Sequence, residues 1–266
     1  MPAEQLLPAD HHKAAIAWGD KVRAAGIHLG LSLAVAVLAA LLVFGLWYPY
    51  PYREISGGRE LFLLVVAVDV VLGPLITFVI FNRRKPMKEL RRDLAFVVLI
   101  QLAALGYGLW TVFIARPVHL VFEIDRFRVV RAIDVDAGLL DKKPAGIDAM
   151  PLLGPTLLAV RAFKDSKESF DATMAALQGA ELGARPDLWR PYAAARPDVI
   201  AAAKPVSQLR TRFPKQLAEI DAALRSAGRT AENTAWLPMV GRKSFWTVLI
   251  DPVSADVIAF IPLDSF

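Results

Sequence analysis

The chain of 266 residues contains no cysteine. This absence excludes disulfide bonds, thiolate metal sites and a cysteine nucleophile. It is compatible with an exported domain that needs no disulfide for its stability.

Motifs of catalysis and of ligand binding are missing as well. The sequence has no Gly-rich phosphate loop, no nucleophile elbow and no HExxH. The histidines His11, His12, His28 and His119 have no metal-ligand spacing within one compartment. His28 lies at the end of an apolar run, which is typical of an interfacial side chain. We therefore expect no metal, no cofactor and no enzymatic activity.

Charged side chains are scarce and apolar ones are abundant. Charged residues make up 21% of the chain and apolar residues 55%, against about 25% and about 45–50% in soluble domains. Residues 1–116 carry 12 basic and 8 acidic side chains, and residues 117–266 carry 19 and 18. The basic excess lies mostly in 82–92, where membrane topology explains it, so we expect no nucleic-acid partner.

Three apolar runs precede Arg116, and each is long enough to cross a hydrocarbon core of about 30 Å as a helix. They are 27–48, 61–81 and 93–115. A basic cluster follows the second run and marks the cytoplasmic side. Its members are Arg83, Arg84, Lys85, Lys88, Arg91 and Arg92. This topology places the amino terminus inside and residues 117–266 outside, which in a bacterium with two membranes is the periplasm.

The sequence thus predicts three parts: a cytoplasmic segment 1–26, a three-helix transmembrane region 27–115 and a periplasmic α+β domain 117–266. Residues 11–26 fit either a short amphipathic helix on the inner membrane surface or a disordered lead-in. The first run is too long for a signal peptide, and the aromatic residues of 47–52 replace a cleavage site. Residues 49–60 are expected to form a short outer loop.

The outer domain shows strand and helix patterns in turn. We expect a hairpin over 119–134, a strand over 156–160, helices over 164–182, 197–203 and 214–227, and closing strands over 236–240, 244–250 and 257–262. Phe170, Met174 and Leu177 fall near one face of the first of these helices. Pro238 places the strand 236–240 at a sheet edge, because proline cannot donate to a ladder.

Asp69 is the strongest candidate for a functional residue. It lies near the middle of the second apolar run, where a carboxylate costs about 2.5–3.5 kcal/mol on insertion scales. Gln101 lies at a comparable depth on the third run and can offset part of that cost by a hydrogen bond. Gly73 and Pro74 follow Asp69 by about one turn, and the proline predicts a kink with exposed carbonyls.

Two interpretations of this group are open. Asp69 and Gln101 either tie the second and third helices together, or Asp69 receives a polar group from a helix of another membrane protein. A proton-transport role is disfavoured, because three helices and one acid make a poor relay.

Glu123 and Asp125 form a second acidic group at the start of the outer domain, beside Arg126 and Arg128. Residues at i and i+2 of a strand point to the same face. A carboxylate pair of this kind can perform acid–base chemistry or bind a cation. More often such a group is a solvated hairpin tip with local ion pairs, each worth little.

Several blocks between 25 and 130 together resemble the TfpX/TfpZ family of type IV pilin accessory proteins. They are AGIHLGLS (25–32), GRELFL (58–63), DVVLGPL (69–75), ELRRDL (89–94), QLAALGY (101–107), RPV (116–118) and EIDRFRVV (123–130). The resemblance implies an inner-membrane protein that helps a cognate major type IV pilin reach or enter the pilus, with no reaction. Other pilus-assembly proteins and membrane lipids are further expected partners.

Two other classes of protein are weighed against this one. An enzyme that modifies pilin or a lipid-linked sugar would need an acid cluster at the outer membrane surface, and Glu123 and Asp125 are its clearest candidates. A periplasmic ligand sensor would need a cytoplasmic output domain, whereas the inner face offers only a short tail and the loop 82–92.

Overall fold

The computed structural model describes residues 9–82 and 85–266. The predicted tail residues 1–8, together with Arg83 and Arg84, lie outside the described residues. The chain divides into two compact units. The bundle unit comprises Met1–Val43 and Glu60–Val112, and the sheet unit comprises Phe44–Arg59 and Phe113–Phe266.

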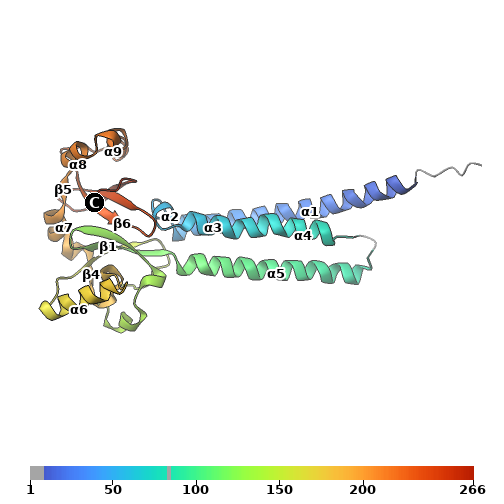
Figure 1. Ribbon diagram of the computed structural model, residues 1–266, viewed down its shortest axis with the longest axis horizontal. Coiled ribbons are helices and arrows are strands. Elements are labelled where there is room, and N and C mark those ends of the chain that lie inside the picture. Colours follow the sequence, from blue (N-terminus) through green and yellow to red (C-terminus); the bar gives the residue numbers. More distant parts are fainter. Residues whose placement is uncertain (1–8, 83–84) are drawn as a thin grey trace, which may run out of the picture. The chain divides into compact units, whose positions relative to one another are not determined.

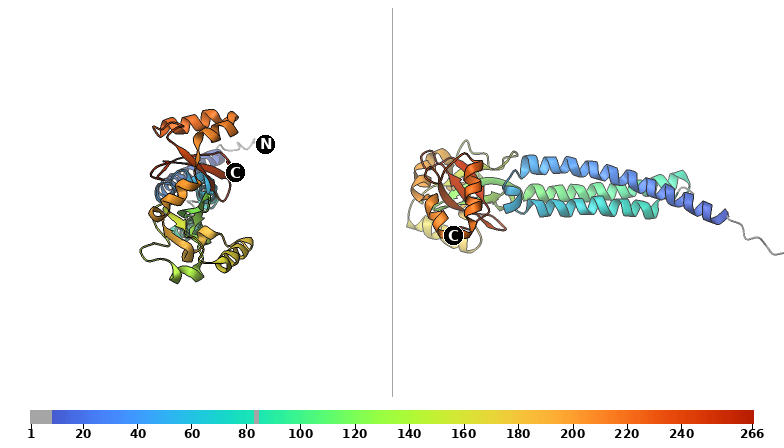
Figure 2. Two further views of the ribbon diagram at one scale, coloured as in Figure 1. Left: turned by 90° about the vertical axis from the view of Figure 1, so that its left-hand side faces the viewer. Right: turned by 90° about the horizontal axis from the view of Figure 1, so that it is seen from above.

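The apolar runs form three long helical segments, which lie alongside one another (Figures 1 and 2). They are α1 (Ala9–Leu42), continued by a π-helical turn (Val43–Trp47); α3 (Gly58–Ala67), a π-helical turn (Val68–Leu72) and α4 (Gly73–Ile80); and α5 (Met87–Ile114). Each segment is long and apolar enough to cross a membrane. The prediction of three spanning helices followed by an α+β domain is confirmed.

The first helix begins earlier than the hydropathy pattern indicates. α1 runs from Ala9 without a break through the predicted boundary at residues 26 and 27. No proline lies between residues 9 and 42, so nothing in this stretch removes a helical hydrogen bond. The place where α1 enters the membrane surface stays a prediction.

The interruption between α3 and α4 follows from Pro74. A proline has no backbone N–H, so the carbonyl four residues earlier in the helix loses its hydrogen-bond donor. The proline ring also clashes with that carbonyl. The helix accommodates this by a π-helical turn over Val68–Leu72, directly before Gly73 and Pro74. The wider turn is centred on the segment that carries Asp69.

The sheet unit is built on one mixed sheet of eight strands with the order β4-β3-β1-β2-β6-β7-β8, and β5 pairs with β6. The strands are β1 (Pro117–Glu123), β2 (Arg126–Arg131), β3 (Thr156–Val160), β4 (Trp189–Pro191), β5 (Lys204–Pro205), β6 (Ala235–Val240), β7 (Phe245–Ile250) and β8 (Val257–Ile261). β1 and β2 form the predicted antiparallel hairpin. The pairs β1–β3 and β2–β6 are parallel, and the other pairs are antiparallel.

Besides its strands, the sheet unit contains the helices α2 (Tyr52–Ile55), α6 (Ser166–Leu177), α7 (Arg196–Ala202), α8 (Val206–Arg212) and α9 (Leu217–Ser226). Of these, α2, α7, α8 and α9 contribute side chains to apolar clusters on the sheet. Residues of α2 and α7 pack on one face of the central strands, and α8 and α9 cover the strands β6 to β8 on the other face. α6 and the α8–α9 pair lie at opposite ends of the sheet (Figure 1).

The prediction that Pro238 marks an edge strand is wrong. β6 lies inside the sheet, between β7 on one side and two different strands on the other. β5 pairs with Ala235 and Trp236, and β2 pairs with Met239 and Val240. Pro238 therefore lies where the strand changes partners, and no ladder bond is needed from its nitrogen.

The predicted outer loop contributes to the core of the sheet unit. Tyr52 and Ile55 are buried in the apolar cluster of the central strands, and the carbonyl of Ile55 accepts a hydrogen bond from the backbone N–H of Lys243 at 3.2 Å. A Cβ on Gly241 would lie 2.0 Å from Cγ1 of Ile55, so only glycine permits this approach. The segment 52–55 is thus fixed against the turn between β6 and β7.

Replacing Gly241 by alanine should therefore destabilise the sheet unit by about 1–3 kcal/mol, because the added methyl group overpacks the contact with Ile55. The measurement is thermal unfolding of the full chain in detergent. Gly45→Ala in the same unit is the matched control, because a Cβ there meets no atom within 4 Å. Equal unfolding temperatures for the two variants would contradict the prediction.

Candidate functional site

A cavity of about 440 Å³ opens within the bundle unit, and all three apolar segments line it. α1 contributes Ala24, Ile27, His28, Leu31, Ser32, Val35, Ala36 and Ala39; the second segment contributes Phe62, Val65, Val66, Asp69, Thr77 and Phe81; α5 contributes Leu94, Val98, Gln101, Leu102 and Leu105. The wall is apolar apart from a few polar side chains. We call this space the bundle cavity.

Asp69 lies in the π-helical turn and lines the bundle cavity. Both of its carboxylate oxygens are shielded, and neither has a hydrogen-bond partner in the described part of the chain. Gln101 does reach the same residue, as the sequence predicted, but its Nε2 donates to the backbone oxygen of Asp69 at 3.2 Å. The tie between the second and third helices therefore uses the carbonyl and leaves the carboxylate unused.

Gly73 explains how Gln101 reaches that carbonyl. A Cβ on Gly73 would lie 1.8 Å from Nε2 of Gln101, so any side chain would displace the amide. Pro74 prevents normal helical hydrogen bonding one turn after Asp69, and the resulting turn presents a carbonyl to a neighbouring helix. Gly73, Pro74 and Gln101 thus act together to hold the two helices and to position Asp69.

Thr77 is a member of the bundle cavity that the sequence analysis missed. Its Oγ1 lies 2.5 Å from Nδ1 of His28, which joins α4 to α1. Asp69, Gly73 and Thr77 are spaced by four residues and therefore share one helix face. That spacing of polar and small residues in an apolar run was the available signal.

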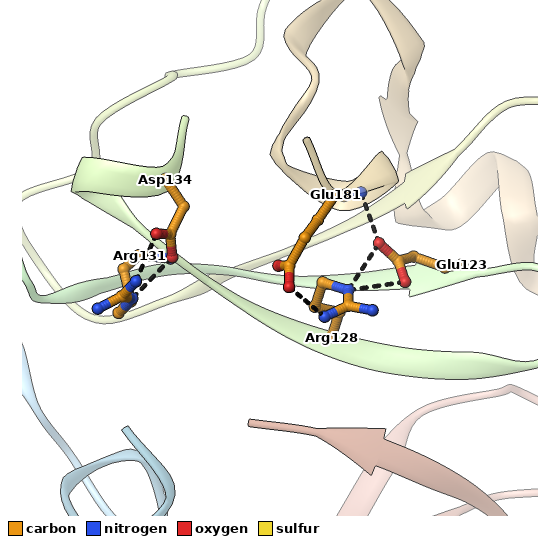
Figure 3. A network of polar contacts seen from close by, with 6 residues as sticks. Glu123, Arg128, Arg131, Asp134 and Glu181 are labelled. Carbon is orange, nitrogen blue, oxygen red and sulfur yellow. Dashed lines mark hydrogen bonds and ion pairs between the residues drawn. The ribbon is translucent and has the colours of Figure 1, made fainter. Parts of the chain in front are cut away.

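Glu123 is a buried acid in the sheet unit, with its residue 4% exposed. Figure 3 shows it at the end of β1, facing Arg128 of β2. Nε of Arg128 lies 3.0 and 2.9 Å from the two carboxylate oxygens, and the N–H of Gly183 donates to Oε1 at 2.5 Å. Nη1 of Arg128 also donates to Glu181 at 2.8 Å. This group, which we call the Arg128 network, joins the hairpin to a segment about 60 residues later.

Asp125 does not share a face with Glu123, so that prediction is wrong. β1 ends at Glu123, and Ile124 has a φ of 53°, which turns the chain out of the strand. The side chain of Asp125 is 59% exposed and pairs with Arg126 at 2.8 Å. The two carboxylates therefore form no joint acid–base or cation site. Among the described residues, no group of three or more acidic or histidine side chains could hold a metal ion.

The described members of the predicted cytoplasmic cluster lie just before α5, at Lys85, and in its first turns. Lys85 forms an ion pair with Asp93 at 2.7 Å, and Lys88, Arg91 and Arg92 are exposed. The orientation that they indicate stays a prediction.

His119 is completely buried on β1, and its ring packs edge-on against Trp189 at 4.7 Å. Nε2 lies 3.1 Å from the carbonyl oxygen of Ala149, and Nδ1 lies 2.7 Å from Oγ1 of Thr156. Because a carbonyl only accepts, Nε2 carries the proton and Nδ1 accepts from the threonine. Burial lowers the pKa of His119 to about 4, so the ring is neutral at physiological pH.

The apolar side chains of α6 point to solvent. Phe170, Met174 and Leu177 are 64%, 41% and 78% exposed, whereas Ala172 on the same helix is fully buried. The sequence pattern placed the three side chains on one face of a helix. The structure shows that this face remains exposed within the described part of the chain.

Replacing Phe170, Met174 or Leu177 by glutamine should change the free energy of unfolding by no more than about 0.5 kcal/mol each, because solvent already contacts them. Chemical unfolding of the full chain measures this. Ala172→Gln is the matched control on the same helix, and it should cost about 1–3 kcal/mol by overpacking. If one of the three exposed-face variants lowers the free energy of unfolding as much as Ala172→Gln does, this face of α6 is packed and the prediction is wrong.

Comparison with known proteins gives a consistent set of relatives. A family model described as "Fimbrial assembly protein FimB" matches residues 16–57. The fimbrial assembly protein of serogroup I from Dichelobacter nodosus is 37% identical over 246 residues, which is 91% of this chain and 94% of that protein. The serogroup E1 protein from the same organism is 36% identical over 246 residues, which is again 91% of this chain and 94% of that protein. The protein of serogroups C1 and C2 is 45% identical over 119 residues, 45% of this chain and 88% of its own. No solved structure gives a significant match.

Proposed function

This chain belongs to the fimbrial assembly protein (FimB) family, and on that premise we propose that it is a non-enzymatic inner-membrane accessory protein for a type IV pilin. In this role it assists the stability of the pilin or its incorporation into the pilus. The cognate major pilin is the main partner, and membrane lipids surround the three apolar segments.

The extent of the match to the relatives carries this proposal. The relatives of serogroups I and E1 align over 91% of the chain, so the match includes most of both units. A protein with membrane-spanning helices and a folded α+β unit is suited to a subunit that has both an apolar helix and a soluble head. The TfpX/TfpZ resemblance of residues 25–130 supports the more specific assignment to a type IV pilin.

The proposed location is the inner membrane, with the sheet unit in the periplasm. Exposed basic side chains at the start of α5 support this orientation, because short positively charged loops are retained in the cytoplasm. A reporter that is active only in the periplasm, fused after Phe266, should be active. Activity of a cytoplasmic reporter at the same position would overturn the orientation.

The enzyme alternative loses its clearest candidates. Glu123 is engaged by Arg128 and by the N–H of Gly183, and Asp125 lies apart from it in solvent. An acid poised for catalysis would have to face a substrate. The arrangement supports a structural role for Glu123 and a non-enzymatic role for the protein.

The test uses a pilus-forming host in which the gene is deleted. We expect surface pili to be lost or reduced, and the full chain to restore them. Photocrosslinkers placed in the complementing chain should capture the major pilin. Normal piliation in the deletion strain together with no pilin crosslink would overturn the proposal.

A matched variant separates the proposal from the enzyme alternative. Asp125→Asn removes an exposed carboxylate without disturbing the Arg128 network, so full complementation is expected. Loss of piliation by Asp125→Asn, with normal protein level and unfolding temperature, would favour an enzyme.

A further inference from the structure

We propose that the bundle cavity is the docking site for a membrane-spanning helix of another protein that carries one protonated amine or guanidinium at the depth of Asp69. The inference deepens the proposed function and rests on it for the biological partner. It assigns to the Asp69 carboxylate a role that is separate from holding the bundle together.

The first argument is that the carboxylate is not needed for helix packing. Gln101 makes the contact between α5 and the second segment through the backbone oxygen of Asp69, and His28 with Thr77 joins α1 to α4. A mid-membrane carboxylate that only tied helices would itself receive one of these bonds. Instead both of its oxygens lack a partner among the described residues.

The second argument is the energetic cost of that arrangement. Asp69 lies at the centre of the candidate span Gly58–Ile80, farthest from both of its ends. Acidic residues inside membrane spans are rare, and they pair with other groups or line a path for a substrate. An unpaired carboxylate that lines an apolar cavity is therefore complementary to a cation that enters the cavity.

The third argument is that the cavity opens at the surface of the bundle. Ile27, Leu31 and Val35 of α1 and Val98 and Leu102 of α5 line it, and they are 58%, 64%, 42%, 49% and 60% exposed. Their spacing of four residues forms one apolar stripe on each helix. A helix that lies between the two stripes contacts both and brings its own side chains to Asp69.

The chemistry excludes the two nearest alternatives to a partner helix. A second copy of this chain brings no cation to this depth, because residues 27–48, 61–81 and 93–115 contain no lysine or arginine. A lipid amine stays in the headgroup region, about 15 Å from the middle of the hydrocarbon core. The cation must therefore be carried by a helix from another protein.

The test uses the full chain reconstituted in lipid nanodiscs with synthetic spanning helices as probes. The probes are leucine–alanine helices of equal length with a central lysine, a central leucine or a central glutamate. A benzophenone amino acid replaces Leu102, which lines the cavity. The matched control carries it at Leu99 on the same helix, which is 64% exposed and does not line the cavity.

We expect the lysine probe to crosslink at position 102 about tenfold more than the leucine probe, as one interhelical polar contact allows. Position 99 should show no preference. Asp69→Asn should abolish the preference and Asp69→Glu should retain it, while both variants elute as single species and keep their unfolding temperatures. Asp69→Asn thus removes the charge at nearly constant size, and Asp69→Glu keeps the charge while it adds one methylene group.

Equal capture of the lysine and leucine probes, an unchanged preference in Asp69→Asn, or crosslinking of position 102 to a second copy would each overturn the inference. The readout does not involve pili. If the lysine probe is preferred but the chain gives no pilin crosslinks in cells, the proposed function alone is refuted. If pilin crosslinks form but the lysine probe is not preferred, the docking role of the bundle cavity alone is refuted.

Discussion

Replacing Arg128 by alanine is expected to lower the free energy of unfolding of the sheet unit by about 3–5 kcal/mol, because it leaves a buried charge without compensation. Arg128 binds Glu123, whose side chain is 5% exposed, and it also binds Glu181. Without the guanidinium, the one partner of the Glu123 carboxylate among the described residues is the N–H of Gly183. A loss of this size is a large fraction of the stability of an ordinary domain, about 5–15 kcal/mol.

The measurement is chemical unfolding of the full chain, followed by tryptophan fluorescence. Arg126→Ala is the control on the same strand, because Arg126 pairs with the exposed carboxylate of Asp125 and lies 5.2 Å from the ring centroid of the exposed Phe266. Exposed contacts of either kind contribute about 0–1 kcal/mol. The double variant Arg128→Met with Glu123→Gln should cost less than Arg128→Ala alone, because the amide is uncharged and still accepts from Gly183. If Arg128→Ala costs no more than Arg126→Ala, the network does not stabilise the sheet unit.

Acidification from pH 6.5 to pH 4 is expected to destabilise the sheet unit through His119. Burial lowers the pKa of His119 from 6.5 to about 4. Below pH 6.5 the unfolded chain binds a proton that the folded chain does not accept until about pH 4. The stabilisation is therefore complete above pH 6.5 and is lost as the pH falls through this window, and it amounts to about 3 kcal/mol.

The geometry explains why protonation is unfavourable. A charged ring would carry a proton on Nδ1, where it now accepts from Thr156, and would place a cation beside Trp189 in an apolar cluster. His119→Gln is the matched variant, because its amide can donate to Ala149 and accept from Thr156 without titrating.

The comparison of the two proteins isolates the effect of His119. Burial raises the pKa of Glu181, and this carboxyl therefore contributes with the opposite sign, since its stabilisation is lost as the pH rises. Glu181 is present in both proteins and cancels in the difference. The wild-type chain should lose more stability than His119→Gln between pH 6.5 and 4, and parallel profiles would contradict the prediction.

The elements that could be predicted are those whose signal is local. The three apolar runs, the β1–β2 hairpin and the strand over Thr156–Val160 follow from run length and alternation within a few residues. The ends of helices were predicted less accurately than their presence. α6 ends at Leu177, five residues before the predicted end, and Gly179 just after it has a positive φ that is typical of a helix terminus.

The candidate site was found only in part, because contacts decide what each polar group does. The sequence identified Asp69, Gly73, Pro74 and Gln101 as one group, but it could not distinguish a bond to the carboxylate from a bond to the carbonyl. Likewise, Glu123 and Asp125 look equivalent in the sequence. Glu123 is buried and accepts a hydrogen bond from the backbone N–H of Gly183, whereas Asp125 is exposed.

Run length and local periodicity were sufficient to assign the class of protein: three apolar segments that can span a membrane, an acid in the middle of one of them, and a separate α+β unit. These features depend on runs and periods that neighbouring residues specify. Long-range contacts were needed to show that the Asp69 carboxylate has no partner among the described residues, that Pro238 lies inside the sheet where its strand changes partners, and that Tyr52 and Ile55 belong to the core of the sheet unit. Each of these depends on which distant segment supplies the facing atoms, and no local pattern carries that information.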